Sequence, residues 1–497
     1  MRINVFAKLL LFICFLAAPS FLAGQAPSSS PIPQETPPPP AAPRPVSIPK
    51  PVEQTLKNGL RVIVIEDHDM PLISAQLLIK NGAEVDPPDL SGLADMTASL
   101  LTKGTKTRTA PQIAQEIEAL GGILNSGAGW DASRASINVM STKIAPAMDV
   151  LVDIVRNPVF KEDEIERLRQ QYVDSLSVAM NDPGTLASFV AARVVFGDAA
   201  YGHPLSGTPS SIEKIQRNDI AELHTRYYRP DNAVLVIGGD IKAVDAFKLA
   251  DSKFGDWSKP SNPLPSRSAT NAVNKDTKPR VVVVDMPDAG QAAVVLARTG
   301  ISRKDPDYFR GIVTNAVLTG YSGRLNQEIR IKRGLSYGAR SSLDARRDIG
   351  AFVASAQTKN PSGAEVASLL TDEVGRLASE PLKETELVPR KAVLIGGFGR
   401  ALETTDGLVA QIASLALHGL SLDEINSYIK NVQSIVPADV QRFASSRLDA
   451  KTANIVIVGN AKEFLPELQK RYPNTEVILA SDLNLDSASL KKASAAK

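Results

Sequence analysis

The two halves of the chain end in the same pattern, and this repetition is the feature that most constrains the fold. Segment 232–239 reads Asn-Ala-Val-Leu-Val-Ile-Gly-Gly, and segment 453–460 reads Ala-Asn-Ile-Val-Ile-Val-Gly-Asn. A similar helix-like stretch precedes each of them, at 220–228 and at 440–448. A short apolar run bounded by turn residues predicts a buried strand. Because 497 residues are too many for one core, we expect two related domains of about 200 residues each.

Each half alternates between strand-like and helix-like segments. The pair Asn58-Gly59 between two apolar runs predicts a β-hairpin at the start of the first half. We therefore expect an α+β fold with two duplicated domains, each a mainly antiparallel sheet with helices packed on one face. The expected strands cover 52–56, 60–66, 73–80, 133–141, 232–239, 280–285, 291–299, 337–345, 350–357 and 453–460. The expected helices cover 91–105, 111–120, 146–156, 161–181, 184–196, 306–319 and 323–333.

The N-terminus has the composition of an export signal. Arg2 and Lys8 precede an apolar stretch at 9–22, and small residues follow it. Retention of this segment as an anchor stays open, although it is short for a bilayer span. After cleavage we expect no membrane span. The expected boundaries are a signal peptide at 1–24, a Pro-rich disordered leader at 25–51, an N-terminal domain at 52–257, a linker at 258–278, a C-terminal domain at 279–480 and a polar tail at 481–497.

Cysteine content and net charge limit which compartment and which partner classes we expect. The one cysteine, Cys14, lies in the signal segment, so the mature chain has no disulfide. Export without disulfides fits a bacterial periplasm. Removing Arg2 and Lys8 lowers the formal net charge from +2 to about 0. A near-neutral chain without a basic run gives no reason to expect nucleic-acid binding.

The segment 91–105 carries the strongest motif. It reads S-G-L-A-D-M-T-A-S-L-L-T-K-G-T and resembles the zinc-binding helix of the insulinase/pitrilysin peptidases, the inverzincins, whose core is H-x-x-E-H. In that alignment Asp95 and Ser99 occupy the two His positions, and Ala98 occupies the Glu position. The family's third ligand, a Glu ahead of an N/D-D-P turn, falls at Ser175, beside Asp174.

The substituted positions argue against a metal in this chain. Residues i and i+4 of a helix share one face, which lets two imidazoles bind one Zn²⁺. Asp95 offers one oxygen, Ser99 is a poor ligand, and Ala98 has no group to handle a proton. The chain has four histidines, and we interpret all of them as surface or packing residues: His68, His203, His224 and His418. We therefore expect no zinc site and no cofactor in this chain.

The resemblance extends over about residues 50–480, nearly all of the mature chain. Leu56-x-Asn58-Gly59-Leu60 matches the opening hairpin of the family, 202–207 its G-H-P-x…G segment, and 227–239 its closing strand. The resemblance implies the metallopeptidase fold of the mitochondrial processing peptidases. It also implies paired two-domain subunits that enclose a chamber, one of which often lacks zinc.

A second motif lies in the C-terminal half. Arg330 and Tyr337 match the family's R-x6-Y pair, which faces the zinc site in active assemblies. Amide hydrolysis builds negative charge on the carbonyl oxygen, so Tyr and Arg donors placed there lower the barrier. The resemblance implies that this pair serves the zinc of a partner subunit.

Three functional hypotheses follow. The first is a non-catalytic, substrate-binding subunit of a periplasmic heteromeric zinc peptidase, which pairs with a homologue bearing intact H-x-x-E-H and acts on peptides or unfolded proteins. The second is an inert scaffold or a peptide-binding protein that uses edge-strand addition. The third, a zinc-free hydrolase, is disfavoured because Ser99 beside Asp95 lacks a histidine base.

Overall fold

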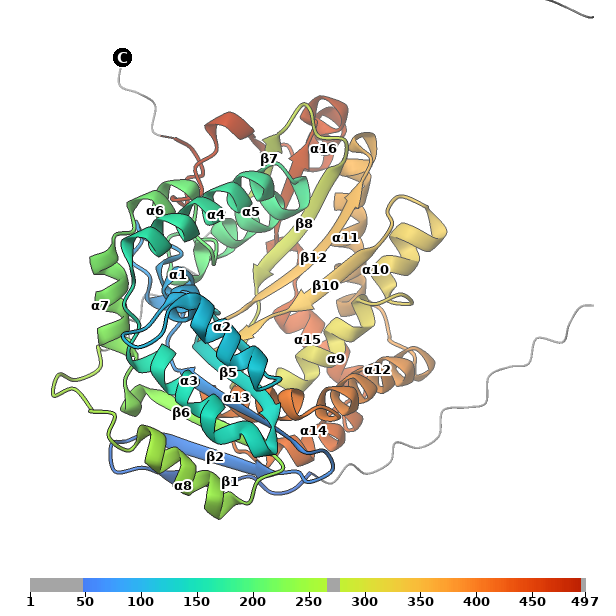
Figure 1. Ribbon diagram of the computed structural model, residues 1–497. Coiled ribbons are helices and arrows are strands. Elements are labelled where there is room, and N and C mark those ends of the chain that lie inside the picture. The colour runs from blue at the N-terminus through green and yellow to red at the C-terminus, as the bar shows by residue number, and fades with distance from the viewer. Residues whose placement is uncertain (1–47, 266–277, 493–497) are drawn as a thin grey trace, which may run out of the picture. The chain divides into compact units, whose positions relative to one another are not determined.

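Two six-stranded sheets with the same strand plan form the framework of the protein (Figure 1). The computed structural model describes residues 48–265 and 278–492. The predicted signal peptide, most of the predicted leader and most of the predicted linker lie outside the described residues. All the described residues belong to one compact unit, Val46–Lys497.

The first sheet has the order β1-β2-β6-β3-β5-β4. Strands β2 and β6 run parallel, and every other neighbouring pair is antiparallel. The central strands are apolar on both faces, which is typical of strands covered on both sides. The strands are β1 (Val52–Thr55), β2 (Arg61–Glu66), β3 (Leu72–Ile79), β4 (Ile123–Ala128), β5 (Ser133–Met140) and β6 (Ala233–Gly239).

The second sheet repeats this plan in the order β14-β7-β13-β8-β12-β10. Its β7 and β13 are parallel, as β2 and β6 are, and β13, β8, β12 and β10 continue antiparallel. The end strand β14 differs from β1, because β14 pairs parallel with β7 whereas β1 pairs antiparallel with β2. The predicted duplication is confirmed. The strands are β7 (Val281–Asp285), β8 (Ala292–Thr299), β10 (Ala339–Leu343), β12 (Ala351–Thr358), β13 (Asn454–Gly459) and β14 (Glu476–Leu479), with a small pair of β9 (Ile301–Ser302) and β11 (Ala345–Arg346).

Each half packs its own helices on one face of its own sheet (Figure 1). The first core joins the sheet to α1 (Leu93–Leu100), α3 (Ile144–Arg156), α7 (Arg217–Tyr227) and α8 (Ala243–Phe254). The second joins its sheet to α9 (Tyr308–Leu318), α11 (Gly363–Ser379), α15 (Pro437–Arg447) and α16 (Leu465–Arg471). The other helices are α2 (Ala110–Ala119), α4 (Glu162–Met180), α6 (Pro209–Lys214), α10 (Arg324–Asn326), α12 (Glu384–Leu402) and α14 (Glu424–Gln433).

The opposite face of each sheet is covered by a helix from the other half, which the sequence did not reveal. Helix α5 (Pro183–Phe196) packs Leu186 and Val190 on the second sheet. Helix α13 (Thr405–Leu417) packs Val409 and Ile412 on the first. Burying one such aliphatic side chain is worth about 1.5–3 kcal/mol. This exchange of helices ties the two halves together.

A loop of the second half adds polar contacts to the first. The Arg347 backbone N–H donates to Asp131 at 2.8 Å, and its guanidinium pairs with Glu84 at 3.0 Å. The neighbouring Arg346 lies over the ring of Trp130, 4.4 Å from its centroid. These contacts fix the relative position of the two sheets within this unit.

Several elements differ from the sequence-based expectations. Strand β4 was not predicted because Asn, Ser and Gly are poor strand formers, and it forms by pairing with β5. The helix expected at 323–333 is the short α10 followed by a π-helical turn, Gln327–Lys332. The expected leader and polar tail are also shorter than predicted. Their inner ends pack into the protein through the buried side chains of Ile48, Leu483, Leu485 and Leu490.

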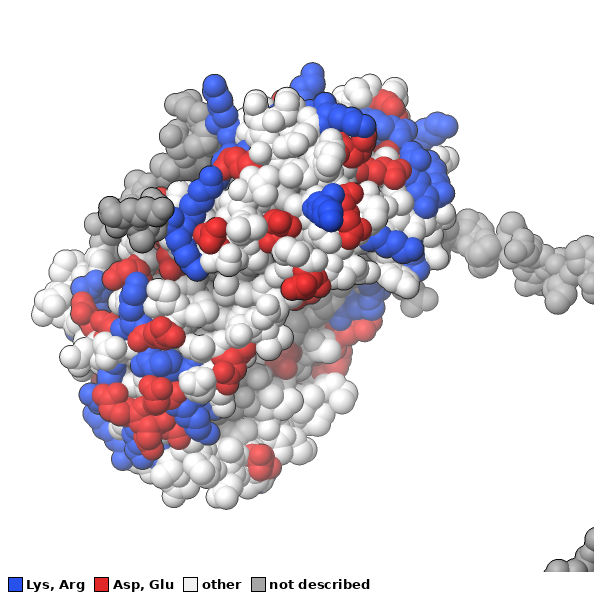
Figure 2. Space-filling view, turned by 90° about the horizontal axis from the view of Figure 1, so that it is seen from above, with Lys and Arg blue, Asp and Glu red and all other residues white. Residues whose placement is uncertain are grey.

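Within the described ranges, no helix combines the length and the apolar character needed to cross a membrane. On the face drawn in Figure 2, basic and acidic side chains are interspersed.

Candidate functional site: a closed helix face and an open cleft

Helix α1 is held in place at its N-terminus by a buried carboxylate. Asp86 accepts hydrogen bonds from the N–H groups of Gly92 at 2.8 Å and Ala94 at 2.9 Å, which would otherwise lack partners. Gly92 has φ of 94° and approaches the backbone of Ser206 so closely that a Cβ would lie 2.9 Å from it. Leu93, Met96 and Leu100 of the helix are buried. Positions 95 and 99 therefore lie on one fixed face, as the motif requires.

That face is occupied by a hydrogen-bonded cluster. The hydroxyl of Tyr172, from α4, donates to Asp95 Oδ2 at 3.1 Å and lies 3.0 Å from Ser99 Oγ. Ser206 Oγ donates to the same Asp95 oxygen at 3.0 Å. The phenol thus lies where ligands at positions 95 and 99 would converge.

Burial dominates the electrostatics of this cluster. It raises the pKa of Asp95, and the hydrogen bonds from Ser206 and Tyr172 only partly oppose that shift. Burial and the Asp95 charge also raise the pKa of Tyr172, so its hydroxyl keeps its proton and remains a donor. The cluster is a self-satisfied polar patch.

The position predicted for a third ligand, Ser175, lies on α4 close in sequence to Tyr172. Ser175 and Asp174 are exposed on α4, and Asp174 accepts a hydrogen bond from Gln170 one turn away. The side chain that α4 presents to Asp95 and Ser99 is that of Tyr172. Ala98 is fully buried. The structure therefore brings Asp95 and Ser99 together through Tyr172, while Ser175 is exposed on the same helix.

These residues do not fit a zinc ion. A catalytic zinc needs three protein ligands with nitrogen, sulfur or carboxylate donors, and the cluster offers one carboxylate. In residues 48–265 and 278–492, no group of three or more His, Cys, Asp or Glu side chains could hold a metal. The four histidines contact backbone carbonyls or surface acids: His203 at Ala83 and Pro204, His224 at Val155, His418 at Ser414, and His68 at Asp240 and Glu66.

The second motif lies in the segment between α9 and β10. Arg330 belongs to the π-helical turn Gln327–Lys332, a geometry that is rare and frequent at functional sites. Its guanidinium carbon lies 5.2 Å from the ring centroid of Tyr321. The segment is fastened from outside, since Arg324 pairs with Glu386 at 2.7 Å. The backbone that carries Arg330 is therefore held in place by this ion pair.

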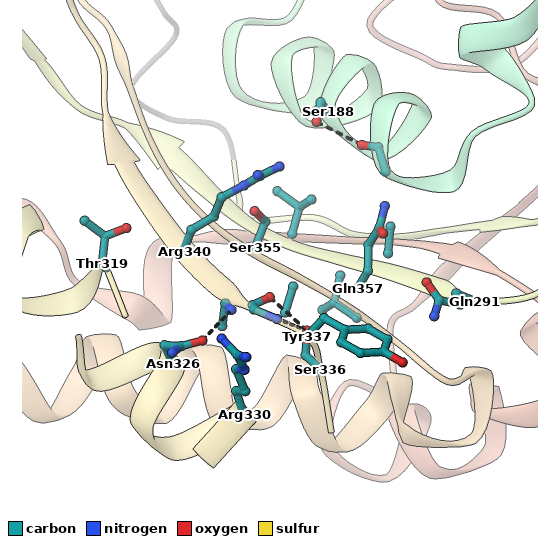
Figure 3. Close-up of a pocket in the computed structure, with 18 of the residues that line it drawn as sticks. Ser188, Gln291, Thr319, Asn326, Arg330, Ser336, Tyr337, Arg340, Ser355 and Gln357 are labelled. Carbon is teal, nitrogen blue, oxygen red and sulfur yellow. Dashed lines mark hydrogen bonds between the residues drawn. The ribbon is translucent and has the colours of Figure 1, made fainter. Parts of the chain in front are cut away.

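Arg330 and Tyr337 line one open cleft of about 620 Å³ (Figure 3). Its walls come from β8, β10 and β12, from the loop that follows α9 and from the start of α5. Tyr337 is 91 % exposed, so its hydroxyl is free to meet a ligand. Figure 3 shows Arg340 extending from the sheet toward the helix that carries Ser188. The cleft brings the predicted Arg/Tyr pair together.

The cleft and the α1 cluster are separate sites. None of Asp95, Ala98, Ser99 and Ser175 belongs to the cleft lining. The sequence did not predict a role for two residues of these sites, Tyr172 and Arg340. The buried spacing of Ile165, Leu168 and Leu176 on α4 was the available signal for Tyr172, because it places position 172 on the inward face.

Comparison with known families identifies the chain. The model of the insulinase peptidase family M16 matches residues 61–198, and the model described as the peptidase M16 inactive domain matches residues 214–394. The chain belongs to the insulinase family. The inactive-domain model matches mainly the second half of this family M16 protein. It therefore does not bear on the altered ligand positions of α1.

Known proteins support the same assignment over most of the chain. An uncharacterized zinc protease of Streptomyces coelicolor is 26% identical and covers 82% of this chain and 89% of its own. One from Rickettsia bellii is 28% identical, covering 81% and 96%. The solved peptidase M16 inactive domain of Pseudomonas fluorescens gives a TM-score of 0.76 at 25% identity, covering 82% and 98%. A protease of Helicobacter pylori gives 0.79 at 21%, covering 83% and 100%, and shares the fold.

Proposed function

We propose that this family M16 protein is the non-catalytic, substrate-binding subunit of a heteromeric zinc peptidase. In this proposal a homologue with an intact H-x-x-E-H helix supplies the zinc. Arg330 and Tyr337 face that zinc site across the shared chamber. The substrates are peptides or unfolded proteins.

The observation that carries the proposal is the contrast in accessibility between the two motifs. The positions of the metal ligands are closed by Tyr172, which contacts Asp95 and Ser99. Tyr337 is 91 % exposed in an open cleft that Arg330 also lines. A chain whose described residues offer no group of metal ligands therefore still presents two donors.

The chemistry of amide hydrolysis gives these donors a use. A phenol O–H and a guanidinium N–H can both donate to a carbonyl oxygen that gains negative charge. The guanidinium can also hold a peptide carbonyl in the ground state by its fixed fork of donors. The role of Arg330 should therefore be visible in KM as well as in kcat, and the role of Tyr337 mainly in kcat.

The test is reconstitution with the zinc-bearing homologue. Peptide cleavage is measured for the homologue alone, for the mixture, and for mixtures with Arg330→Ala or Tyr337→Phe. We expect the wild-type chain to raise activity. Each variant should lose on the order of 100-fold in kcat/KM, the usual loss when one oxyanion donor is removed.

Two matched controls separate function from folding. Arg400→Ala changes an exposed arginine of α12 outside the cleft lining, and Asn58→Ala changes a hairpin residue far along the chain. Arg400→Ala should leave the mixture fully active, whereas Asn58→Ala loses two hydrogen bonds to 254–257 carbonyls and reports on stability alone. Full activity with Arg330→Ala and Tyr337→Phe would refute the assigned roles.

A second candidate function is an inert scaffold or a peptide-binding protein. It is favoured by β4, an end strand of the first sheet whose outer side pairs with no other strand among the described residues, because an edge strand can take up an extended peptide without metal. Tight peptide binding by the chain, with no stimulation of any zinc-bearing homologue, would favour this candidate.

We further propose that the protein is exported to the periplasm, where its partner would also lie. The support is the composition of residues 1–24 and the position of Cys14 within them. N-terminal sequencing of the protein from the periplasmic fraction tests the proposal. A full-length chain in the membrane fraction would show that the segment is kept as an anchor.

A further inference from the structure

The cleft that holds Arg330 and Tyr337 has an unbalanced charge. Its lining includes the side chains of Arg330 and Arg340 and no Asp or Glu. Among the described residues, neither guanidinium forms an ion pair or a hydrogen bond, and Arg330 only stacks near Tyr321. Two cations therefore face the same open space without an anion.

Neighbouring arginines show that this is a local property of the cleft. Arg324 pairs with Glu386 at 2.7 Å, and Arg333 pairs with Glu328 at 2.9 Å. Both lie within a few residues of Arg330 but point their charge at a carboxylate. Guanidinium groups that lack such a partner favour an anion brought from outside.

Another acid that lies near the cleft in the chain, Asp182, is already engaged. Asp182 precedes Gly184 at the start of α5, and its carboxylate accepts hydrogen bonds from the backbone N–H and the hydroxyl of Thr185, both at 2.7 Å. It serves as the N-cap of that helix. Its charge is therefore satisfied by the helix terminus and is not directed at Arg340.

The position of Arg340 suits it for selecting part of a bound peptide. It lies on β10, one of the two end strands of the second sheet, and Figure 3 shows it reaching from the sheet toward α5. The cleft also presents the amides of Gln291 and Gln357, which can bond to a peptide backbone. Arg340 can thus pair with a negative charge on the peptide while the two amides form hydrogen bonds with the peptide backbone.

We propose that the cleft selects peptides that carry a carboxylate, and that Arg340 is the residue that determines this specificity. The inference deepens the proposed function, since it names the substrate class of the same cleft. The carboxylate comes either from an Asp or Glu side chain or from a free C-terminus. Both present the same planar acceptor pair to a guanidinium.

The test measures binding to the isolated mature chain, so that no partner is needed. Four extended peptides labelled with an uncharged fluorophore share one sequence and differ at two places: a central Glu or Gln, and a free or amidated C-terminus. Fluorescence anisotropy gives the Kd of each at 50 mM and 300 mM salt. We expect the Glu or free-acid form to bind about tenfold more tightly than the uncharged form, with a smaller difference at high salt.

Variants assign the preference to one side chain. Arg340→Gln should abolish it, Arg340→Lys should keep part of it, and Arg400→Gln should leave it unchanged, because Arg400 is exposed on α12 outside the cleft. Circular dichroism melting of each variant checks folding. The peptide pair that shows the preference identifies the source of the carboxylate.

The outcomes separate this inference from the proposed function. Equal binding of all four peptides, no binding, or a preference that survives Arg340→Gln would overturn the inference. Stimulation of the zinc-bearing homologue would then still stand on Arg330 and Tyr337. Conversely, a carboxylate preference that depends on Arg340, in a chain that stimulates no homologue, would support the inference and refute the proposed catalytic partnership.

Discussion

The two halves of this family M16 protein place different chemistry at matching ends of the same sheet plan. In the first half, β4 is one of the end strands, and the neighbouring α1 carries Asp95 and Ser99. In the second half, β10 is the corresponding end strand, and the segment before it carries Arg330 and Tyr337. The first set of polar groups is bonded within the protein, whereas the second faces an open cleft.

The difference between the two regions shows how polar side chains are satisfied when they are closed off from ligands and when they are exposed. Half-buried groups cost free energy unless they are paired, and Tyr172 provides the partner for Asp95 and Ser99. Tyr337 is 91 % exposed, so water can satisfy its hydroxyl. The paired groups of the α1 cluster therefore contribute to stability, and the exposed groups of the cleft remain available for binding.

The largest expected effect comes from rebuilding a metal site on α1. Asp95→His with Ser99→His places two imidazoles on one helix face, and adding Tyr172→Glu supplies a third ligand from the position that contacts both. We expect the triple variant to hold about one zinc per chain. Its affinity should exceed that of the double variant by more than about 100-fold, since even an outer-shell change costs 10–100-fold.

The matched control uses the position that the sequence suggested. Asp95→His, Ser99→His and Ser175→Glu carry the same three ligand types, but Ser175 is exposed on α4. Elemental analysis after washing with a weak chelator measures zinc in each variant. If the Ser175 variant retains zinc as well as the Tyr172 variant, then the position given to Tyr172 is wrong.

A smaller effect compares two phenol hydroxyls. Tyr172→Phe removes the donor to Asp95 and the partner of Ser99, so we expect the free energy of unfolding to fall by about 1–3 kcal/mol. Tyr337→Phe removes an exposed hydroxyl, and its effect should stay within about 0.5 kcal/mol. Urea unfolding measures both. Equal losses would contradict the distinction between a closed and an open site.

Much of the fold followed from residue patterns. The repeated runs that became β6 and β13, and the Asn58-Gly59 hairpin, are local signals that periodicity and turn chemistry expose. The exchange of α5 and α13 between the sheets is not local, because their apolar faces look the same whichever sheet they cover. Strand β4 also depends on its neighbour, since it forms against β5.

The candidate site divided in the same way. Positions 95, 98 and 99 were assigned from the resemblance of segment 91–105 to the family's zinc helix, and the structure places them on α1. The contact of Tyr172 was not predicted because it depends on how α4 rotates against α1, and the rotation that buries Leu168 and Leu176 turns Tyr172 inward. Arg340 has no motif of its own, and only the shape of the cleft reveals it.

The smallest effect concerns the charge of Asp95 and would show which force governs the closed site. Burial raises its pKa in the folded state, so the stability that it contributes is fully present below its unfolded pKa of about 3.9 and is lost as the pH rises through the folded value. Asp95→Asn does not titrate. The free energy of unfolding of Asp95→Asn minus that of the wild type should therefore increase between pH 4 and pH 8, as urea unfolding at each pH would measure. A difference that decreases over this range would mean that the donors Tyr172 and Ser206 favour the carboxylate more than burial disfavours it. The cluster would then stabilise the ionised carboxylate of Asp95. The α1 cluster and the cleft would in that case differ in charge as well as in exposure to solvent.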